Sequence, residues 1–125
     1  MAAARVLLVD DDPDICRFLA MLLEIEGFAP ETATRADEAL VACDRESPAA
    51  ILMDIAMPDV DGLELCRILR RRGVSCPILV VSARPGHELG RKALEAGADE
   101  FIRKPFDNAD LLARLRARIG VPAPA

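Results

Sequence analysis

The chain has 125 residues, of which 52% are apolar, and a formal net charge of −5. This length suffices for one domain with one core and excludes two independent domains. The acidic balance argues against the broad positive field that nucleic-acid binding needs, so we expect no direct contact with nucleic acid.

Other features of the composition exclude a zinc site and a membrane span. The four cysteines lack a Cys-x-x-Cys spacing, and they are typical of small buried residues in a reducing compartment. No charged-then-apolar leader opens the sequence, and no apolar run approaches the roughly 20 residues that span a bilayer. We therefore expect a cytoplasmic protein. A basic stretch, Arg67 with residues 70–72, is interpreted as a solvated helix end, with a phosphate-binding patch as the alternative.

The N-terminal part of the chain predicts a strand, a helix and a second strand. The run Arg5–Val9 predicts a strand, after which Asp12 can cap a helix that starts at Pro13. The second strand, over residues 28–33, contains Pro30, which favours an edge position in a sheet.

The middle of the chain predicts a helix and a buried strand. Thr34 and Asp37 resemble a capping box at the helix start, although Asp replaces the usual Glu or Gln. A continuous apolar strand over residues 49–53 leads into Asp54. Such a run is typical of a central strand that is covered on both faces.

Strands and helices continue to alternate toward the end of the chain. Further strands are expected over 77–82 and 101–103, and helices are expected to end at Gly73, Gly97 and Gly120. The alternation predicts an α/β fold with a five-stranded parallel sheet. We expect an N-terminal extension over 1–4, one domain over 5–119, and a Pro- and Ala-rich tail or linker start over 120–125.

Four of the predicted strands end in residues suited to phosphate chemistry, and the carboxyl ends of parallel strands meet at one edge of a sheet. These residues are Asp10 and Asp11, Asp54, Ser82 and Lys104. Three carboxylates at one edge repel each other, and a divalent cation relieves that repulsion. Mg²⁺ is the natural candidate because it prefers oxygen ligands. The alternative is a solvated acidic loop that binds nothing.

Asp54 can also act as a nucleophile and accept a phosphoryl group as an acyl phosphate. Lys104 would then supply an ammonium group to balance the charge on the phosphoryl oxygens. Ser82 would supply a hydroxyl donor once the group has arrived, although a serine that merely ends a strand is the simpler interpretation.

An ordered set of short motifs resembles the receiver domain of two-component response regulators, the CheY-like superfamily. The matching segments are Val9-Asp10-Asp11-Asp12, Leu52-Met53-Asp54, Met57-Pro58, Asp61-Gly62, Val81-Ser82-Ala83, Gly97-Ala98-Asp99 and Lys104-Pro105-Phe106. The resemblance extends over residues 5–119. It implies a doubly wound, flavodoxin-like (βα)5 fold with strand order 2-1-3-4-5.

The resemblance also implies a signalling role rather than that of an enzyme. Asp54 would accept a phosphoryl group from a sensor histidine kinase or a histidine phosphotransferase. Mg²⁺ would be held by Asp11, Asp54 and the backbone carbonyl of Ala56, with Asp10 assisting. The cis peptide bond of such domains would lie between Lys104 and Pro105.

Ser82 and Phe101 match the switch pair of the family. In such domains the hydroxyl moves toward the phosphoryl group and the ring turns inward, which reshapes the surface of the fourth helix, fifth strand and last helix for an output partner or domain. On sequence alone, Phe101 fits a plain core residue equally well.

Ala56 and Arg84 occupy positions that tune dephosphorylation in receivers. Ala56 offers no side-chain help to an attacking water, and Arg84 can shield the phosphoryl group. We therefore expect a long-lived phosphorylated state.

Partner contacts are implied at two surfaces. The candidate apolar contacts for a kinase or phosphotransferase are Ile15, Phe18, Pro105 and Phe106, although Phe18 also fits core packing. A second set resembles the charged face that some receivers use to form homodimers: Asp99, Glu100, Asp110, Arg114 and Arg118. Gly90 stands where a basic residue would complete one of its ion pairs.

Two other interpretations compete with a receiver. A phosphatase of the haloacid-dehalogenase type would use Asp10 as the nucleophile, but it has no role for Asp54. A receiver-like domain used only for protein contacts is disfavoured because Asp10, Asp11, Asp54 and Lys104 are all present. The sequence leaves open whether the chain is a complete regulator or part of a longer one.

Overall fold

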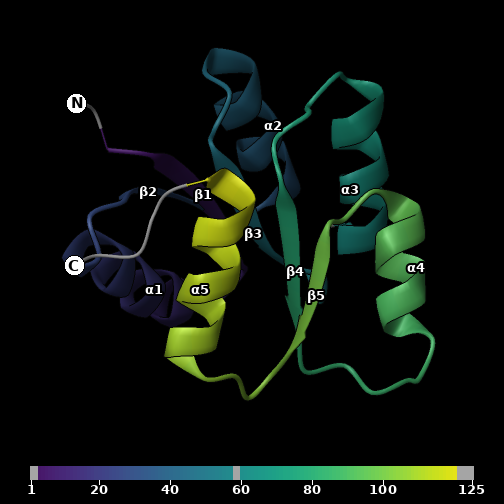
Figure 1. Ribbon diagram of the computed structural model, residues 1–125. Coiled ribbons are helices and arrows are strands. Elements are labelled where there is room, and N and C mark those ends of the chain that lie inside the picture. The colour runs from purple at the N-terminus through teal and green to yellow at the C-terminus, as the bar shows by residue number, and fades with distance from the viewer. Residues whose placement is uncertain (1–2, 58–59, 121–125) are drawn as a thin grey trace.

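The computed structural model describes residues 3–57 and 60–120, and its centre is a parallel sheet of five strands in the order β2-β1-β3-β4-β5 (Figure 1). The strands are β1 (Arg5–Val9), β2 (Ala29–Ala33), β3 (Ala50–Asp54), β4 (Ile78–Ser82) and β5 (Glu100–Arg103). The helices are α1 (Pro13–Ile25), α2 (Ala36–Arg45), α3 (Gly62–Arg71), α4 (Leu89–Ala96) and α5 (Asn108–Ile119). The predicted α/β fold, the strand order, the edge position of β2 and the central position of β3 are confirmed.

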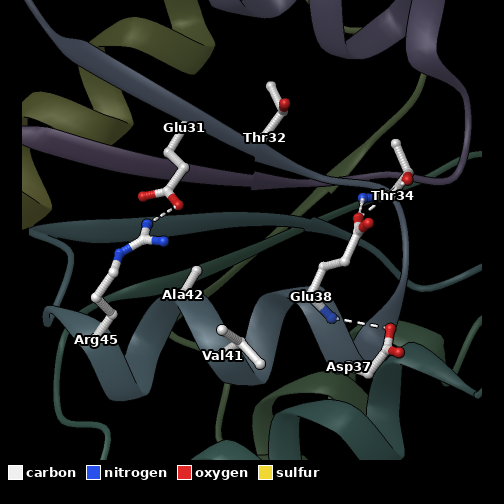
Figure 2. Close-up of a pocket in the computed structure, with 8 residues that line it drawn as sticks. All are labelled: Glu31, Thr32, Thr34, Asp37, Glu38, Val41, Ala42 and Arg45. Atoms are coloured by element: carbon white, nitrogen blue, oxygen red, sulfur yellow. Dashed lines mark hydrogen bonds and ion pairs between the residues drawn. The ribbon is translucent and has the colours of Figure 1, made fainter.

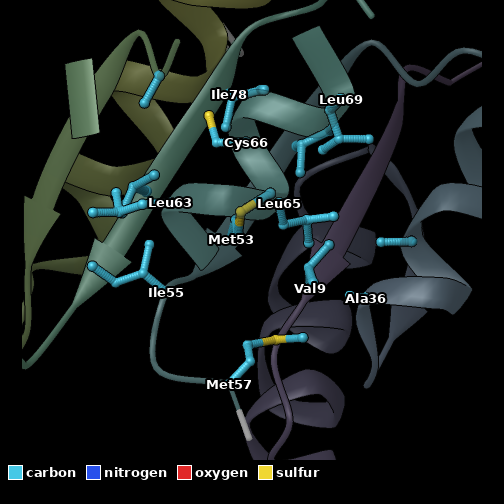
Figure 3. Close-up of a cluster of buried hydrophobic side chains, with 14 of the residues drawn as sticks. Val9, Ala36, Met53, Ile55, Met57, Leu63, Leu65, Cys66, Leu69 and Ile78 are labelled. Atoms are coloured by element: carbon cyan, nitrogen blue, oxygen red, sulfur yellow. The ribbon is translucent and has the colours of Figure 1, made fainter. Parts of the chain in front are cut away.

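Helices cover both faces of the sheet, so the strands are buried on both sides. Side chains alternate between the faces along each strand. In β1, Val6 and Leu8 pack with α1 and α5, whereas Leu7 and Val9 pack with α2, α3 and α4. Figure 3 shows the second of these clusters, in which α3 presents Leu65 and neighbouring apolar side chains to the sheet.

Capping of three helices follows the same local rule. Asp12, Asp61 and Asp107 precede α1, α3 and α5, and each carboxylate accepts a hydrogen bond from the backbone N–H two residues later. This satisfies an N–H that has no partner inside the helix. The predicted cap at Asp12 and the helix start near Asp107 are confirmed.

The predicted capping box at the start of α2 is wrong in its partner. The backbone N and Oγ1 of Thr34 donate to Glu38 Oε1, at 2.8 and 3.1 Å, whereas Asp37 Oδ1 accepts from the backbone N of Glu38. Arg35 is the N-cap residue, so Thr34 lies one position further from the helix. The longer side chain of Glu38 spans the extra distance.

Several predicted boundaries shift by one or two residues. α1 ends at Ile25, and β2 begins at Ala29, one residue later than predicted. Phe28, just before this strand, is buried in the core, and the guanidinium of Arg116 lies 5.8 Å from its ring centre. β5 begins one residue early, at Glu100.

The basic stretch at the end of α3 is solvated only in part. Arg70 donates through Nε to the carbonyl of Gly97 at 2.9 Å and through Nη2 to Asp99 Oδ2 at 3.0 Å. Its Nη1 donates to the carbonyls of Val74 and Cys76. The interpretation as a solvated helix end is therefore wrong for Arg70, whereas the other three arginines make exposed ion pairs.

Some predicted features lie outside the described residues. These are Pro58 of the matched loop, residues 1–2 of the extension and residues 121–125 of the tail. Where the structure does describe the chain, no helix combines the length and the apolar character needed to cross a bilayer.

Gly62 holds the loop after β3 against the start of α3. Its N–H donates to the carbonyl of Ile55 at 3.0 Å, and an added Cβ would lie 2.3 Å from Ile55 Cα. Backbone cannot yield as a flexible side chain can, so Gly62→Ala should lower the free energy of unfolding by about 1–3 kcal/mol. Chemical denaturation measures this change. Gly90→Ala is the control, since a Cβ there would approach Phe101 no closer than 3.4 Å. Equal stability of the two variants would contradict the expectation.

Candidate functional site

The carboxyl edge of the sheet brings together four of the residues singled out from the sequence. Asp10 follows β1, Asp54 ends β3, Ser82 ends β4 and Lys104 follows β5, and these four strands are adjacent in the sheet. Lys104 Nζ lies 2.9 Å from Asp54 Oδ2 and 3.6 Å from Asp10 Oδ2. The backbone N of Lys104 also donates to the carbonyl of Ser82 at 2.9 Å. The ammonium group is thus placed between two carboxylates.

Both carboxylate oxygens of Asp54 are held in place. Oδ1 accepts from the backbone N of Ala56 at 2.8 Å, and Oδ2 accepts from Lys104. The side chain is 13% exposed, which leaves a narrow route to solvent. Asp54 is therefore oriented for chemistry at Oδ2, with a cation already beside that atom.

Asp10 is the more buried of the two carboxylates. It is 6% exposed, and its Oδ1 accepts from the backbone N of Asp12 at 3.0 Å. Burial raises the pKa of Asp10 above 3.8, against the lowering effects of the Asp12 N–H and the Lys104 charge. The carboxylates of Asp54 and Asp11 add to the rise. The ionised form of Asp10 is thus destabilised in the folded protein.

Lys104 responds to the same environment in the opposite sense. Burial alone would lower the pKa of Lys104. The hydrogen bond and charge of Asp54, together with Asp10, outweigh that effect and raise the pKa above 10.5. Stability from this raised pKa is fully present below 10.5 and is lost as pH rises through the higher folded value. Lys104 is a cation at neutral pH.

Asp10→Asn should stabilise the fold while weakening the site. Asn keeps an oxygen acceptor for the Asp12 N–H and removes a buried charge, so the free energy of unfolding at neutral pH should rise by about 0.5–2 kcal/mol. The gain should fade as pH falls through the raised pKa of Asp10 toward 3.8, because the wild-type carboxyl is then neutral as well. Denaturant titrations at several pH values measure this; a gain that grows toward acid pH would refute it.

The oxygen donors at this edge fit a hard divalent cation. Asp10 and Asp54 present carboxylates, and the backbone N–H of Ala56 donates to Asp54, so Ala56 lies beside the site. Asp11 is exposed. Within residues 3–57 and 60–120, no three His, Cys, Asp or Glu side chains form a metal-binding group. Mg²⁺ is usually held by one or two carboxylates with several waters, so the donor set suits it without a closed cage.

Ser82 and Phe101 lie on neighbouring strands near this edge. Ser82 is fully buried, and its Oγ accepts from the backbone N of Arg84 at 3.0 Å. Phe101 is half-buried against the cluster formed with α2, α3 and α4. The Lys104–Pro105 peptide bond is cis, as the resemblance implies.

Sequence reasoning missed Arg103, the last residue of β5. Its Nη1 donates to the carbonyl of Arg84 at 2.8 Å, its Nη2 donates to the carbonyl of Gly86 at 3.1 Å, and its guanidinium lies 5.3 Å from the Phe101 ring centre. The only available signal was its position between Phe101 and Lys104, which says nothing of the loop it contacts.

The four candidate partner residues share one apolar groove. Ile15, Phe18, Pro105 and Phe106 line a cavity of about 450 Å³ beside Lys104. Phe18 is 52% exposed, so the alternative of core packing is wrong for this residue.

The charged residues of the expected homodimer face pair within the chain. Glu100 accepts from Arg114 at 3.1 Å and from Arg118 at 2.7 Å, and Arg114 also binds Asp110. Asp99 is bound by Arg70 instead.

A groove of about 550 Å³, larger than the apolar groove beside Lys104, lies between β2 and α2 (Figure 2). Its acidic side chains already have partners: Glu31 pairs with Arg45 and Arg5, and Glu38 accepts from Thr34. This groove lies apart from Asp10, Asp54 and Lys104, none of which lines it.

The fold and the carboxyl-edge cluster define a doubly wound α/β domain with an Asp–Lys site. A family model for the response regulator receiver domain matches residues 6–116, so the chain belongs to that family. It is a signalling domain rather than an enzyme. The family match does not support the haloacid-dehalogenase-like alternative.

Individual relatives are also response regulators. The response regulator MprA of Mycobacterium leprae is 43% identical over 113 residues, which cover 90% of this chain and 50% of that protein. The chain thus spans about half the length of the curated relatives it matches.

Solved structures show the same fold. A CheY-like receiver domain protein from Methanospirillum hungatei has a TM-score of 0.89 at 32% identity, covering 95% of each chain. The BeF3-activated N-terminal receiver domain of RstA from Klebsiella pneumoniae has a TM-score of 0.87 at 33% identity, covering 92% of this chain and 97% of that one.

Proposed function

We propose that the chain accepts a phosphoryl group on Asp54 from a histidine kinase or a histidine phosphotransferase. The observation that carries this proposal is the contact of Lys104 Nζ with Asp54 Oδ2 at 2.9 Å, beside the buried carboxylate of Asp10. A cation held at a nucleophilic oxygen is placed to balance the charge that arrives with a phosphoryl group.

In the proposed reaction, Asp54 Oδ2 attacks the phosphorus of a phosphohistidine. The new O–P bond forms as the P–N bond breaks, and the donor imidazole leaves with the electron pair of that bond and takes up a proton. Lys104 stays within reach of the phosphoryl oxygens, and the Ala56 N–H keeps its hydrogen bond to Oδ1.

Receiver domains generally use Mg²⁺, and the oxygen donors of this chain fit that ion. We propose that Asp11, Asp54 and the carbonyl of Ala56 hold it, with Asp10 assisting. When bound, the ion would add positive charge that helps to balance the charge on the phosphoryl oxygens.

The proposed output step uses Ser82 and Phe101. Ser82 Oγ would leave the N–H of Arg84 and turn toward a phosphoryl oxygen, and the half-buried ring of Phe101 would move inward. The surface formed by α4, β5 and α5 would change as a result. An output partner or domain, or a second copy of the chain, would respond to that surface.

We also propose where the phosphodonor protein binds. The groove lined by Ile15, Phe18, Pro105 and Phe106 would receive the phosphodonor protein, since it adjoins Lys104.

The domain would extend over 5–119, with 120–125 as a tail or linker. The free cysteines are compatible with a cytoplasmic location.

The phosphorylated state should be long-lived. Ala56 has no side chain that can activate water, and Arg84 Nη2 lies 3.5 Å from the carbonyl of Ile55, the residue after Asp54. Loss of the phosphoryl group from purified protein, followed by intact mass, should therefore be slow, and Arg84→Ala should accelerate it several-fold. Rapid loss from the wild type would contradict the role of both residues.

The test of the proposed function is phosphorylation by a small acyl phosphate with Mg²⁺. Intact mass should show one added phosphoryl group, and peptide mapping should place it on Asp54. No added group, or a group on another residue, would overturn the proposal. Turnover of phosphate esters with Asp10 as the nucleophile would instead indicate a phosphatase.

A further inference from the structure

Arg103 contacts the loop that holds one member of the proposed switch pair. Arg103 in β5 is the register partner of Ser82 in β4. Its two guanidinium nitrogens donate to the carbonyls of Arg84 and Gly86, at 2.8 and 3.1 Å. The backbone N of Arg84 in turn donates to Ser82 Oγ. Arg103 therefore supports the peptide segment that donates a hydrogen bond to the Ser82 hydroxyl.

Arg103 also contacts the other member of the pair. Phe101 and Arg103 are two residues apart on one strand, so their side chains project from the same face. The guanidinium lies 5.3 Å from the ring centre, within the range of a cation–π contact. On another side the ring adjoins Gly90 of α4, whose missing side chain leaves the ring near the helix backbone.

We propose that Arg103 restrains the unphosphorylated conformation by contacting both switch elements at once. This inference rests on the proposed function, because it assigns a regulatory residue to the same site. An inward turn of Phe101 breaks the ring contact, and a displacement of residues 84–86 toward the site breaks the two carbonyl contacts. Arg103 is a positioning residue that touches neither the phosphoryl group nor Asp54.

Thermodynamic linkage determines whether removing Arg103 strengthens or weakens the binding of a phosphoryl mimic. If Arg103 stabilises only the unphosphorylated state, removing it shifts the population toward the activated state before any ligand binds. A phosphoryl mimic that prefers the activated state must then bind more tightly by the same factor. Since Arg103 is exposed and its contacts are shared with water, we expect an effect of about fivefold, at the low end of coupling between sites.

The experiment compares Arg103→Met with Arg67→Met. Both variants remove one exposed guanidinium and keep an apolar stem, and Arg67 makes an exposed ion pair with Glu64 on α3. Because the chain has no Trp, Phe101→Trp in each background provides a single fluorescent reporter at the switch. The ligand is beryllium fluoride with Mg²⁺, and the phosphorylation rate with an acyl phosphate is measured without the Trp substitution.

Arg103→Met should bind beryllium fluoride about fivefold more tightly than Arg67→Met and should be phosphorylated faster. Its ligand-free emission should shift toward the saturated spectrum. Unchanged affinity and emission, or weaker binding together with lower stability to denaturant, would overturn the proposal. If the wild type binds no beryllium fluoride and gains no phosphate, the proposed function itself fails, and Asp54→Asn serves as the reference for that outcome.

Discussion

Asp54→Asn should abolish phosphorylation by an acyl phosphate while leaving the chain folded. The substitution keeps an oxygen that accepts from the Ala56 N–H, but an amide is not a nucleophile toward phosphorus. It also turns an NH₂ donor toward Lys104, whose remaining anionic partner is Asp10 at 3.6 Å. The loss should be complete by intact mass, with cooperative thermal unfolding retained.

Asp44→Asn provides a matched control for this loss. Asp44 lies in α2 and makes an exposed ion pair with Arg72, so its removal should not affect phosphorylation. If Asp54→Asn gained phosphate as fast as Asp44→Asn, another residue would be the acceptor, and the role assigned to Asp54 would be wrong.

Lys104→Met should slow phosphorylation by about 10²–10³-fold, the usual effect of losing one preorganised charge at a transition state. Methionine keeps the apolar stem and leaves the carboxylates of Asp10 and Asp54 without the cation between them. The rate with a small acyl phosphate measures this effect, because that donor does not need the apolar groove. Lys92→Met, on α4, is the matched control.

The same variant should change the pH dependence of stability. Without the Lys104 charge, one of the effects that lower the pKa of Asp10 is lost, so the pKa of Asp10 rises further. Acids whose folded pKa is raised contribute stability at low pH that is lost as pH rises. Lys104→Met should therefore lose more stability at neutral than at acid pH; an equal loss at both would show that the ammonium matters only through packing.

The main features of the site could be predicted because they depend on strand ends. An apolar run followed by Asp54 or Lys104 puts that residue at the carboxyl edge whatever the rest of the chain does, once the sheet is parallel. Helix caps at Asp12 and Asp107 were predictable for a similar reason, since the capping bond spans two residues.

Features that depend on the packing of distant segments could not be predicted. Arg70 shares its sequence signal with its arginine neighbours, and what distinguishes it is its contacts with the carbonyls of Gly97, Val74 and Cys76 and with Asp99. Phe18 lies on a helix whose apolar residues extend beyond the buried face, so sequence spacing did not decide its exposure. The role of Arg103 depends on the loop after β4, whose position next to Arg103 the sequence does not indicate.

The contacts of Arg70 have a consequence for how α4 can move. They hold the carbonyl of Gly97, just after α4, and the carboxylate of Asp99, which also accepts from the backbone N of Ile78 at the start of β4. The end of α4 remote from the candidate site is thus attached to α3 and to the sheet. The near end, at Leu89, follows the loop that Arg103 contacts. A displacement of α4 should be a tilt about its C-terminal end rather than a translation, with the largest movement at Leu89.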